Sequence, residues 1–185
     1  MPAIISPQLT IQEISFSAHW QQILELRESS RRDKDPRLSQ QLFPAGMYDE
    51  FDDTSMHWGI FDDENNLIAS ARLSVHREIS ELPDRFLFAD IWDKELPAPI
   101  ASLNRLSVAT AYRRQGISAQ MDTIRLNKAK RIGCRSICGT THGKRSQKFL
   151  EDGFHLHHSN LLSTITGTDE LTGEDLPLDF YYKLL

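Results

Sequence analysis

The sequence predicts an α+β fold in three layers (α/β/α), in which helices cover both faces of a mixed, mostly antiparallel sheet of six to seven strands. Two observations support this prediction. Segments typical of strands alternate along the chain with segments of helical periodicity. Near the middle, residues 101–133 have the pattern of a strand, a turn and a helix in succession. The 185 residues suit one domain, spanning residues 1–185, with a core of its own.

The first part of the chain is expected to supply a strand, two helices and a hairpin. Leu9–Phe16 is typical of a strand, and Ser17 can cap the helix that follows. The Asp-Pro pair at 35–36 favours the start of a second, short helix, because proline suits the first helical turn. Met56–Phe61 and Leu67–Val75 then form a hairpin.

A long connection separates that hairpin from the central strand. Its segment 84–96 predicts a short helix with Phe86, Phe88 and Trp92, which either contributes to function or packs on the sheet. After the central helix the expected elements are a strand, a helix and a strand pair. They span Arg135–Thr141, Lys144–Asp152, Phe154–Thr164 and Pro177–Leu185.

The central helix is expected to be amphipathic. Its apolar positions fall on one side at helical spacing, and the basic residues Arg125, Lys128 and Arg131 are expected mostly to face elsewhere. The apolar positions are Ile117, Met121, Ile124 and Ile132.

Composition narrows the function classes. The net charge of −5 disfavours a nucleic-acid partner. No apolar stretch reaches the ~20 residues of a membrane span, and the start of the chain lacks a secretory signal pattern. The two cysteines, Cys134 and Cys138, cannot complete a zinc site by themselves. His155 and His157 give two ligands at most, so no metal is expected. We expect a cytoplasmic protein without a membrane partner.

The turn between the central strand and helix is a candidate anion site. The first amides of a helix have no acceptor within the helix, and the helix dipole favours negative charge there. Gly116 allows close approach of a ligand, and Arg113 and Arg114 add positive charge. Neither GxxxxGK[ST] nor GxGxxG occurs in the chain. The turn therefore predicts a phosphate or pyrophosphate ligand.

These residues resemble the acyl-CoA signature of the GNAT acetyltransferase superfamily, [RQ]-x-x-G-x-[GA]. Arg113 and Gly116 match it, and Ser118 replaces the final Gly or Ala. The preceding LSV strand (106–108) and the later SQKFLEDGF (146–154) are similar to further elements of that superfamily. The resemblance covers most of the chain. It implies a GNAT-like fold and transfer of an acyl group, acetyl or longer, from acyl-CoA to the amine of a small molecule or amino acid.

The resemblance also implies where acyl-CoA would bind. The pantetheine arm would run along the central strand, with the Val108 N–H polarising the thioester carbonyl, and the turn would hold the pyrophosphate. Phe149 aligns with a tyrosine that acts as general acid in many of these enzymes. The expected contacts are Leu106, Ser107, Val108, Arg113, Arg114, Gln115, Gly116, Ile117, Ser118 and Phe149.

Catalytic residues are harder to assign. The superfamily often has a glutamate on the central strand, where this chain has Asn104, which can orient the amine but cannot accept a proton. His142 and Glu78 are the remaining candidate bases. Ser146 or solvent would protonate the departing thiolate.

A second resemblance is to the acyl-homoserine-lactone (autoinducer) synthases. Arg27, Arg72, Arg105 and the run Asp49–Asp52 match residues of that family, although Ser102 stands where it has a glutamate. The three arginines, together with Trp92, are candidate substrate-binding residues, and Arg72 or Arg105 could bind a carboxylate of the acceptor. Alternatively, the arginines and aspartates form a buried ion network that ties helix to sheet.

Three functions therefore stay open. The first is an acyl-CoA-dependent N-acyltransferase acting on a small amine. The second is a synthase that uses an acyl-carrier protein, and the third is a non-catalytic module that binds CoA or a protein partner. A homodimer is compatible with each. A carrier protein would dock on Lys128, Lys130, Arg131, Lys144, Arg145 and Lys148.

Overall fold

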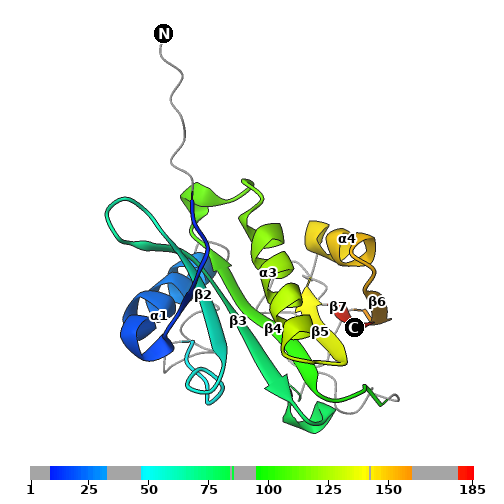
Figure 1. Ribbon diagram of the computed structural model, residues 1–185. Coiled ribbons are helices and arrows are strands. Elements are labelled where there is room, and N and C mark those ends of the chain that lie inside the picture. Colours follow the sequence, from blue (N-terminus) through cyan, green and yellow to red (C-terminus); the bar gives the residue numbers. More distant parts are fainter. Residues whose placement is uncertain (1–8, 33–46, 84, 86–94, 142, 160–178) are drawn as a thin grey trace, which may run out of the picture.

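The computed structural model describes residues 9–32, 47–83, 85, 95–141, 143–159 and 179–185 (Figure 1). Three α-helices, two short 3₁₀ helices and seven strands make up this part of the chain. In chain order they are β1 (Gln12–Ile14), α1 (Phe16–Arg32), β2 (Met56–Phe61), β3 (Leu67–His76), η1 (Ile79–Glu81), β4 (Ile100–Val108), η4 (Thr110–Tyr112), α3 (Ile117–Arg131), β5 (Ser136–Thr141), α4 (Lys144–Glu151), β6 (His155–His158) and β7 (Asp179–Leu184).

The seven strands form one mixed sheet in the order β1-β2-β3-β4-β5-β7-β6. Every neighbouring pair is antiparallel except β4 and β5, which run parallel. A parallel pair needs a crossover connection, and α3 supplies it. The predicted mixed, mostly antiparallel sheet of six to seven strands is therefore confirmed.

Helices cover both faces of the sheet, as Figure 1 shows: α3 and α4 lie on one face and α1 on the other. β3 is buried from both sides, and its side chains alternate between the two layers. Ala69, Ala71 and Leu73 belong to the main apolar core, whereas Arg72 and Ser74 make polar contacts on the α1 face.

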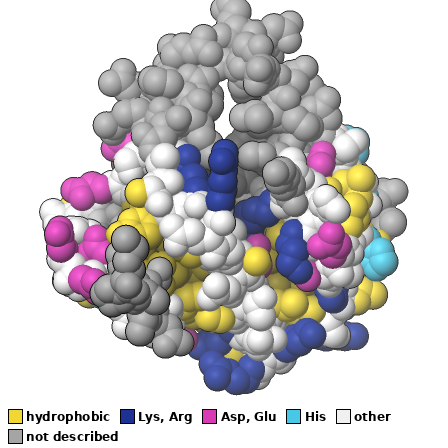
Figure 2. All heavy atoms as spheres, turned by 90° about the horizontal axis from the view of Figure 1, so that it is seen from above, with side chains coloured by type: hydrophobic (Ala, Val, Ile, Leu, Met, Phe, Trp, Pro, Cys, Tyr) yellow, Lys and Arg dark blue, Asp and Glu magenta, His cyan; other side chains and the backbone are white. Residues whose placement is uncertain are grey.

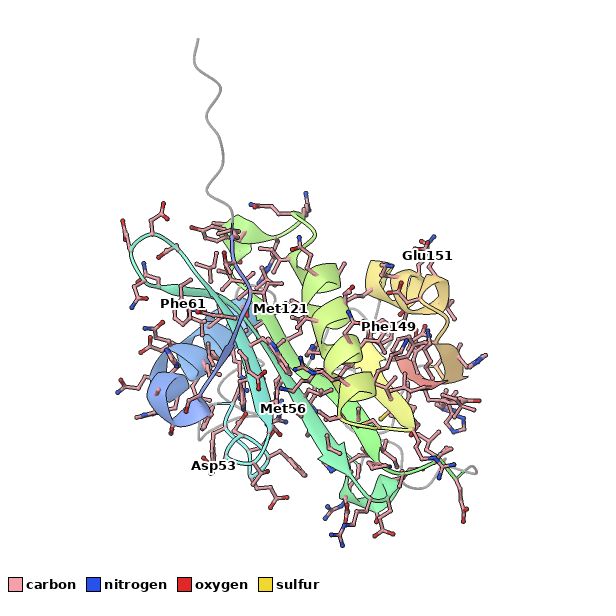
Figure 3. The ribbon with its side chains drawn as sticks, in the orientation of Figure 1. Asp53, Met56, Phe61, Met121, Phe149 and Glu151 are labelled. Atoms are coloured by element: carbon pink, nitrogen blue, oxygen red, sulfur yellow. The ribbon has the colours of Figure 1, made fainter. Side chains whose placement is uncertain are left out.

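The main core lies between the sheet and the α3–α4 layer. Met121 of α3 and Phe149 of α4 are both buried there, and Figure 3 shows them between their helices and the sheet. Phe149 stacks on Phe154, with 4.6 Å between ring centroids, and one of its edges packs over Gly139. This packing fixes α4 against the end of β5.

Several predicted boundaries shift. α1 begins at Phe16, so Ser17 lies inside the first turn and does not cap the helix. Ile132 follows the end of α3 and is 43% exposed, so it is not part of the buried stripe. The first strand is confined to Gln12–Ile14. The predicted helices at 35–36 and over most of 84–96 lie outside the described residues. No helix in the described part of the chain has the length and apolar character that crossing a membrane requires.

Candidate functional site

The central strands β4 and β5 part halfway along their length. They pair from Ile100 opposite Ser136 to Leu103 opposite Gly139, and no further. Beyond that point β4 continues to Val108 alongside β3, and β5 continues alongside β7. One edge of β4, from Asn104 to Val108, therefore faces an opening in the sheet.

A β-bulge shapes the edge of this opening. Ser70 lies opposite Ser107 and Arg72 opposite Asn104, so β4 has one extra residue in this interval. Arg105 adopts a φ of 50° there. As a result two consecutive side chains, Asn104 and Arg105, both reach the α1 face, where they contact Arg72 and Asp49 respectively. Bulges commonly re-aim side chains next to functional sites in this way.

The amide of Val108 points into the opening. Ala109 donates to the Ile68 carbonyl of β3 at 2.9 Å, and hydrogen-bonded pairs alternate along an antiparallel ladder. Val108, the next residue along, therefore directs its N–H away from β3. Its carbonyl accepts a hydrogen bond from Arg113 Nε at 3.1 Å. The N–H that is expected to polarise a thioester carbonyl is thus directed into the opening.

The turn before α3 leaves the helix N-terminus accessible. Gly116 occupies the N-cap position with a φ of 78°, and no side chain of the described residues caps the helix. A Cβ added at Gly116 would meet nothing within 4 Å. The preceding Arg114 also has positive φ, 64°, and its side chain is exposed. Figure 2 looks onto this end of the molecule, where Lys and Arg side chains gather near the middle of the face.

The other residues predicted to contact the cofactor differ in orientation and burial. Arg113 does not extend toward the ligand position, because its guanidinium binds the carbonyls of Val108 and Ser30. It instead ties the turn to β4 and to α1. Ile117 and Phe149 lie in the core. Leu106, Ser107 and Ser118 are half-buried, and Gln115 is exposed.

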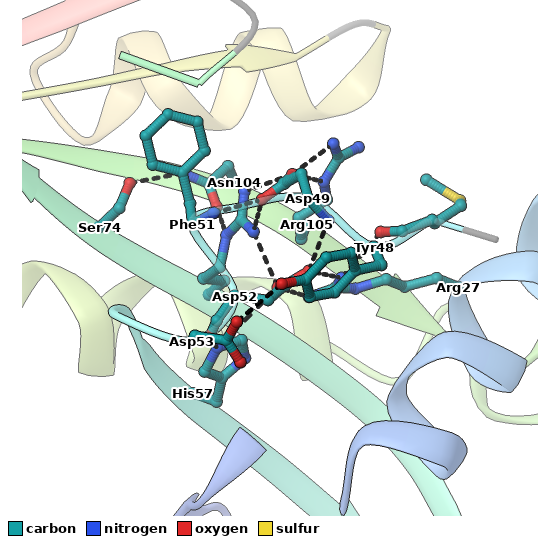
Figure 4. Close-up of polar contacts among 12 residues, drawn as sticks. Arg27, Tyr48, Asp49, Phe51, Asp52, Asp53, His57, Ser74, Asn104 and Arg105 are labelled. Atoms are coloured by element: carbon teal, nitrogen blue, oxygen red, sulfur yellow. Dashed lines mark hydrogen bonds and ion pairs between the residues drawn. The ribbon is translucent and has the colours of Figure 1, made fainter. Parts of the chain in front are cut away.

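Three arginines and two aspartates form a network on the α1 face (Figure 4). Arg27 binds Asp52 through both terminal nitrogens, at 2.8 and 2.7 Å. Arg72 contacts both Asp49 and Asp52, and Arg105 donates to Asp49 at 2.6 Å. Burial alone would raise the pKa of Asp49, but hydrogen bonds and charge from Arg72 and Arg105 outweigh it and lower the pKa to about 2.

This geometry supports the ion-network interpretation of Arg27 and Arg72. Their side chains are 1% and 0% exposed, and their guanidinium groups are occupied by carboxylates. Arg105 keeps 10% of its side chain exposed at the surface end of the network. The network joins α1, the 49–52 loop, β3 and the bulge of β4, and so fixes the α1 side of the opening.

The predicted catalytic residues do not converge on one point. Asn104 is held by Arg72, which donates to its Oδ1, and its Nδ2 donates to Ser74. Glu78 is exposed and accepts from Ser80. Ser146 of α4 donates to Asp179 at 3.2 Å. His142 and Trp92 lie outside the described residues. Of the described candidates, Asn104 alone lines a recess where β4 and β5 part, with Ser102, Gly139 and Thr140 among its neighbours.

A second charged cluster lies on the α3 side of the bulge, and the expectation that Arg125 faces away from the apolar side of the helix is wrong. Arg125 is fully buried and donates to the backbone carbonyls of Arg72 at 2.8 Å and Asn104 at 3.2 Å. It pairs with Asp122, which also binds Arg145 of α4. Burial lowers the pKa of Arg125 to about 10, so it stays charged at neutral pH. The sequence contained a signal for its burial, because Arg125 follows Ile117 and Met121 at four-residue spacing and so lies on the same side of the helix.

In the described part of the chain, no group of three or more His, Cys, Asp or Glu residues is placed to hold a metal ion. The opening beside β4, the Val108 amide directed into it and the uncapped start of α3 instead present backbone hydrogen-bond donors. The strand edge offers backbone hydrogen bonds to an extended chain, and the helix N-terminus offers them to a diphosphate.

Comparison with known proteins agrees with this assignment. Residues 20–154 match the family model described as "Acetyltransferase (GNAT) family". No curated protein matches the chain. Similar solved structures include a putative N-acetyltransferase from Lactobacillus plantarum, with 16% identity and a TM-score of 0.61 over 96% of this chain and 98% of that one.

Two further solved structures carry bound molecules. A phosphinothricin acetyltransferase from Sinorhizobium meliloti in complex with AcCoA has 15% identity and a TM-score of 0.59, over 96% of this chain and 88% of that one. The C-terminal condensation domain of Ebony in complex with beta-alanyl-dopamine has 13% identity and a TM-score of 0.68, over 96% and 99%. At these identities the similarity shows the fold.

Proposed function

The chain belongs to the acetyltransferase (GNAT) family, and on that premise we propose that it is an N-acyltransferase that moves an acyl group, acetyl in the simplest case, from acyl-CoA to the amine of a small molecule. The observation that carries the proposal is the opening between β4 and β5, with the Val108 amide at its edge and the uncapped start of α3 at its end. The AcCoA complex of a protein with similar fold supports the same donor.

Acyl-CoA, when bound, supplies the acyl group as a thioester. The residues of this chain would bind and orient it. The backbone from Arg114 to Ser118 would hold the diphosphate, and the exposed edge of β4 would hold the pantetheine arm. The Val108 N–H would donate to the oxygen that gains charge during the reaction, a contribution worth roughly 3 kcal/mol for one such donor.

No described side chain is well placed as a general base. Asn104 lies at the point where the strands part, but its amide is a hydrogen-bonding group and cannot accept a proton. It is therefore proposed to orient the acceptor. An α-amino group with a pKa near 8 is partly neutral at neutral pH, so acyl transfer to such an amine does not depend on a strong base.

The carrier-protein alternative receives less support from the surface. Lys128 binds Glu13, Arg145 binds Asp122 and Lys148 binds Asp152. Half of the basic residues expected to dock a carrier are thus engaged within the chain.

A thermal-shift titration with CoA and acetyl-CoA, followed by a thiol-release assay over a panel of amines, tests the proposal. We expect both ligands to stabilise the protein and thiol release to depend on the amine. Gly116→Asp should abolish stabilisation, because it places a carboxylate at the diphosphate position. Gly133→Asp is the matched control, since Gly133 has a φ of 82° and open surroundings at the other end of α3.

Stabilisation by CoA without thiol release would indicate a binding module. Stabilisation by an acyl-carrier protein, with no response to CoA, would indicate the carrier-dependent alternative. Either result would refute the proposed reaction.

A further inference from the structure

A hollow of about 290 Å³ lies beside the candidate site on the α1 face of the sheet. It is bordered by residues 51–55, by the end of β3 and by η1. Its lining residues are Phe51, Thr54, Ser55, Ser74, Val75, His76 and Glu81. Ser74 pairs in register with Ser102 of β4, which lines the recess where β4 and β5 part. The hollow is therefore one strand away from the recess in which Asn104 is proposed to orient the acceptor.

A chain of hydrogen bonds joins the two cavities. Arg72 can only donate, so Asn104 Oδ1 accepts from it, and Asn104 Nδ2 must be the donor to Ser74 Oγ at 3.0 Å. Ser74 Oγ lies 2.7 Å from His76 Nε2. The Ser74 hydroxyl has two acceptor lone pairs and one proton, so it can accept from Asn104 and also hydrogen-bond His76 Nε2 in the direction that the histidine tautomer sets.

The charges around the hollow exclude an anionic occupant. Among the described residues that line the hollow, Glu81 alone has a formal charge, because burial lowers the pKa of His76 to about 4 and leaves it neutral. Arg72 cannot bind a carboxylate there, since its guanidinium is held by Asn104, Asp49 and Asp52. The flanking segments add the exposed carboxylates Glu50, Asp53 and Glu78, against the exposed cations Arg77 and Arg85.

The polar groups of the hollow suit hydroxyl and amino groups. The Ser55 hydroxyl is buried without a hydrogen-bond partner among the described residues, and the neutral His76 ring offers one nitrogen, as donor or acceptor according to its tautomer. Glu81 can accept from a hydroxyl or pair with an ammonium, and the Phe51 ring, 5.5 Å from that of His76, supplies an apolar wall. A carboxylate or phosphate would meet one like charge and no cation among these residues.

We propose that this hollow is the subsite for the far end of the acceptor, and that it selects amines whose second polar group is a hydroxyl or an amine and not a carboxylate or phosphate. The inference rests on the proposed acyl transfer and deepens it. It also revises the expectation that Arg72 or Arg105 binds an acceptor carboxylate.

Three acceptors of equal chain length separate the alternatives: 1,4-diaminobutane, 4-amino-1-butanol and 4-aminobutanoate. With acetyl-CoA as donor, we expect kcat/KM for the diamine and the amino alcohol to exceed that for the amino acid by at least ~10-fold. Glu81→Gln should lower the value for the diamine more than for the amino alcohol. Glu64→Gln, in the exposed turn before β3, is the control and should change neither.

Preference for 4-aminobutanoate, or equal rates for all three, would overturn the inference and leave acyl transfer intact. Should none of the three react, calorimetric titration into the CoA complex decides, and binding of the amino acid as tight as that of the others overturns it. Failure of the wild-type chain to bind acetyl-CoA would refute the proposed function itself, so the two failures are distinguishable.

Discussion

Replacing Asp52 with asparagine should strongly destabilise the protein, because it removes the carboxylate that pairs with both Arg27 and Arg72. The Asp52 side chain is fully buried and accepts two hydrogen bonds from Arg27 and one from Arg72, all within 2.8 Å. Burial would raise the pKa of Asp52, but the hydrogen bonds and charge of Arg27 outweigh it, so the pKa is lowered and the group is ionised at neutral pH. Asp52→Asn leaves Arg27 buried without a carboxylate.

Removing one partner of a buried ion pair costs about 3–5 kcal/mol. For a chain of this size that corresponds to a fall in Tm of roughly 6–20 °C. Urea unfolding followed by tryptophan fluorescence measures the change, because Trp58 is buried in the main core. Asp53→Asn is the matched control, since Asp53 is exposed and accepts from the Tyr48 hydroxyl at 2.7 Å, and exposed pairs contribute ~0–1 kcal/mol. A loss below about 1 kcal/mol for Asp52→Asn, or equal losses for both variants, would contradict the argument.

Three further results are expected. The pKa of Asp49 is lowered to about 2 from its usual 3.8, which contributes roughly 2 kcal/mol to the free energy of unfolding. This contribution is present above pH 3.8 and is lost as the pH falls through 2. In Asp49→Asn the unfolding free energy, measured by urea unfolding at each pH, should therefore fall less steeply toward acid pH. Arg125→Met should lower the unfolding free energy by about 3–5 kcal/mol, whereas Arg125→Lys, which can still donate, should lose less in the same assay. Val108→Pro removes an N–H that does not bond to β3. CoA binding, measured by thermal shift, should therefore persist, while the rate of thiol release should fall ~100-fold. Equal losses of binding and of thiol release would contradict the role assigned to this N–H.

Much of the fold followed from local sequence patterns. The hairpin of β2 and β3 and the succession β4–turn–α3 carry strong strand and helix signals, and the structure confirms them. The turn at Gly116 was also identifiable, because a glycine before a helix has few alternatives. These features depend on residues close together in the chain, where propensity and periodicity carry most of the information.

The geometry of the site depended on contacts that no local pattern contains. The bulge at Arg105 follows from the pairing of β4 with β3 and from the charged groups on either side of the sheet. The direction of the Arg113 side chain follows from where α1 ends, since one of its acceptors is the Ser30 carbonyl. His76 gave no signal of its own, because its role depends on Ser74 and Asn104, which reach it only through the register of the sheet.

The two buried charge clusters have a common structural reason. A bulge interrupts the hydrogen-bond ladder, and an unpaired buried carbonyl is costly. Arg125 donates to the carbonyls of Arg72 and Asn104 from the α3 side, while Asp49 accepts from the side chains of Arg72 and Arg105 on the α1 side. The charges thus stabilise an irregular point of the sheet, which is also where β4 separates from β5. Loss of Arg125 should therefore change the opening as well as the stability, and the Arg125→Lys variant separates the two effects, because it retains a donor for those carbonyls.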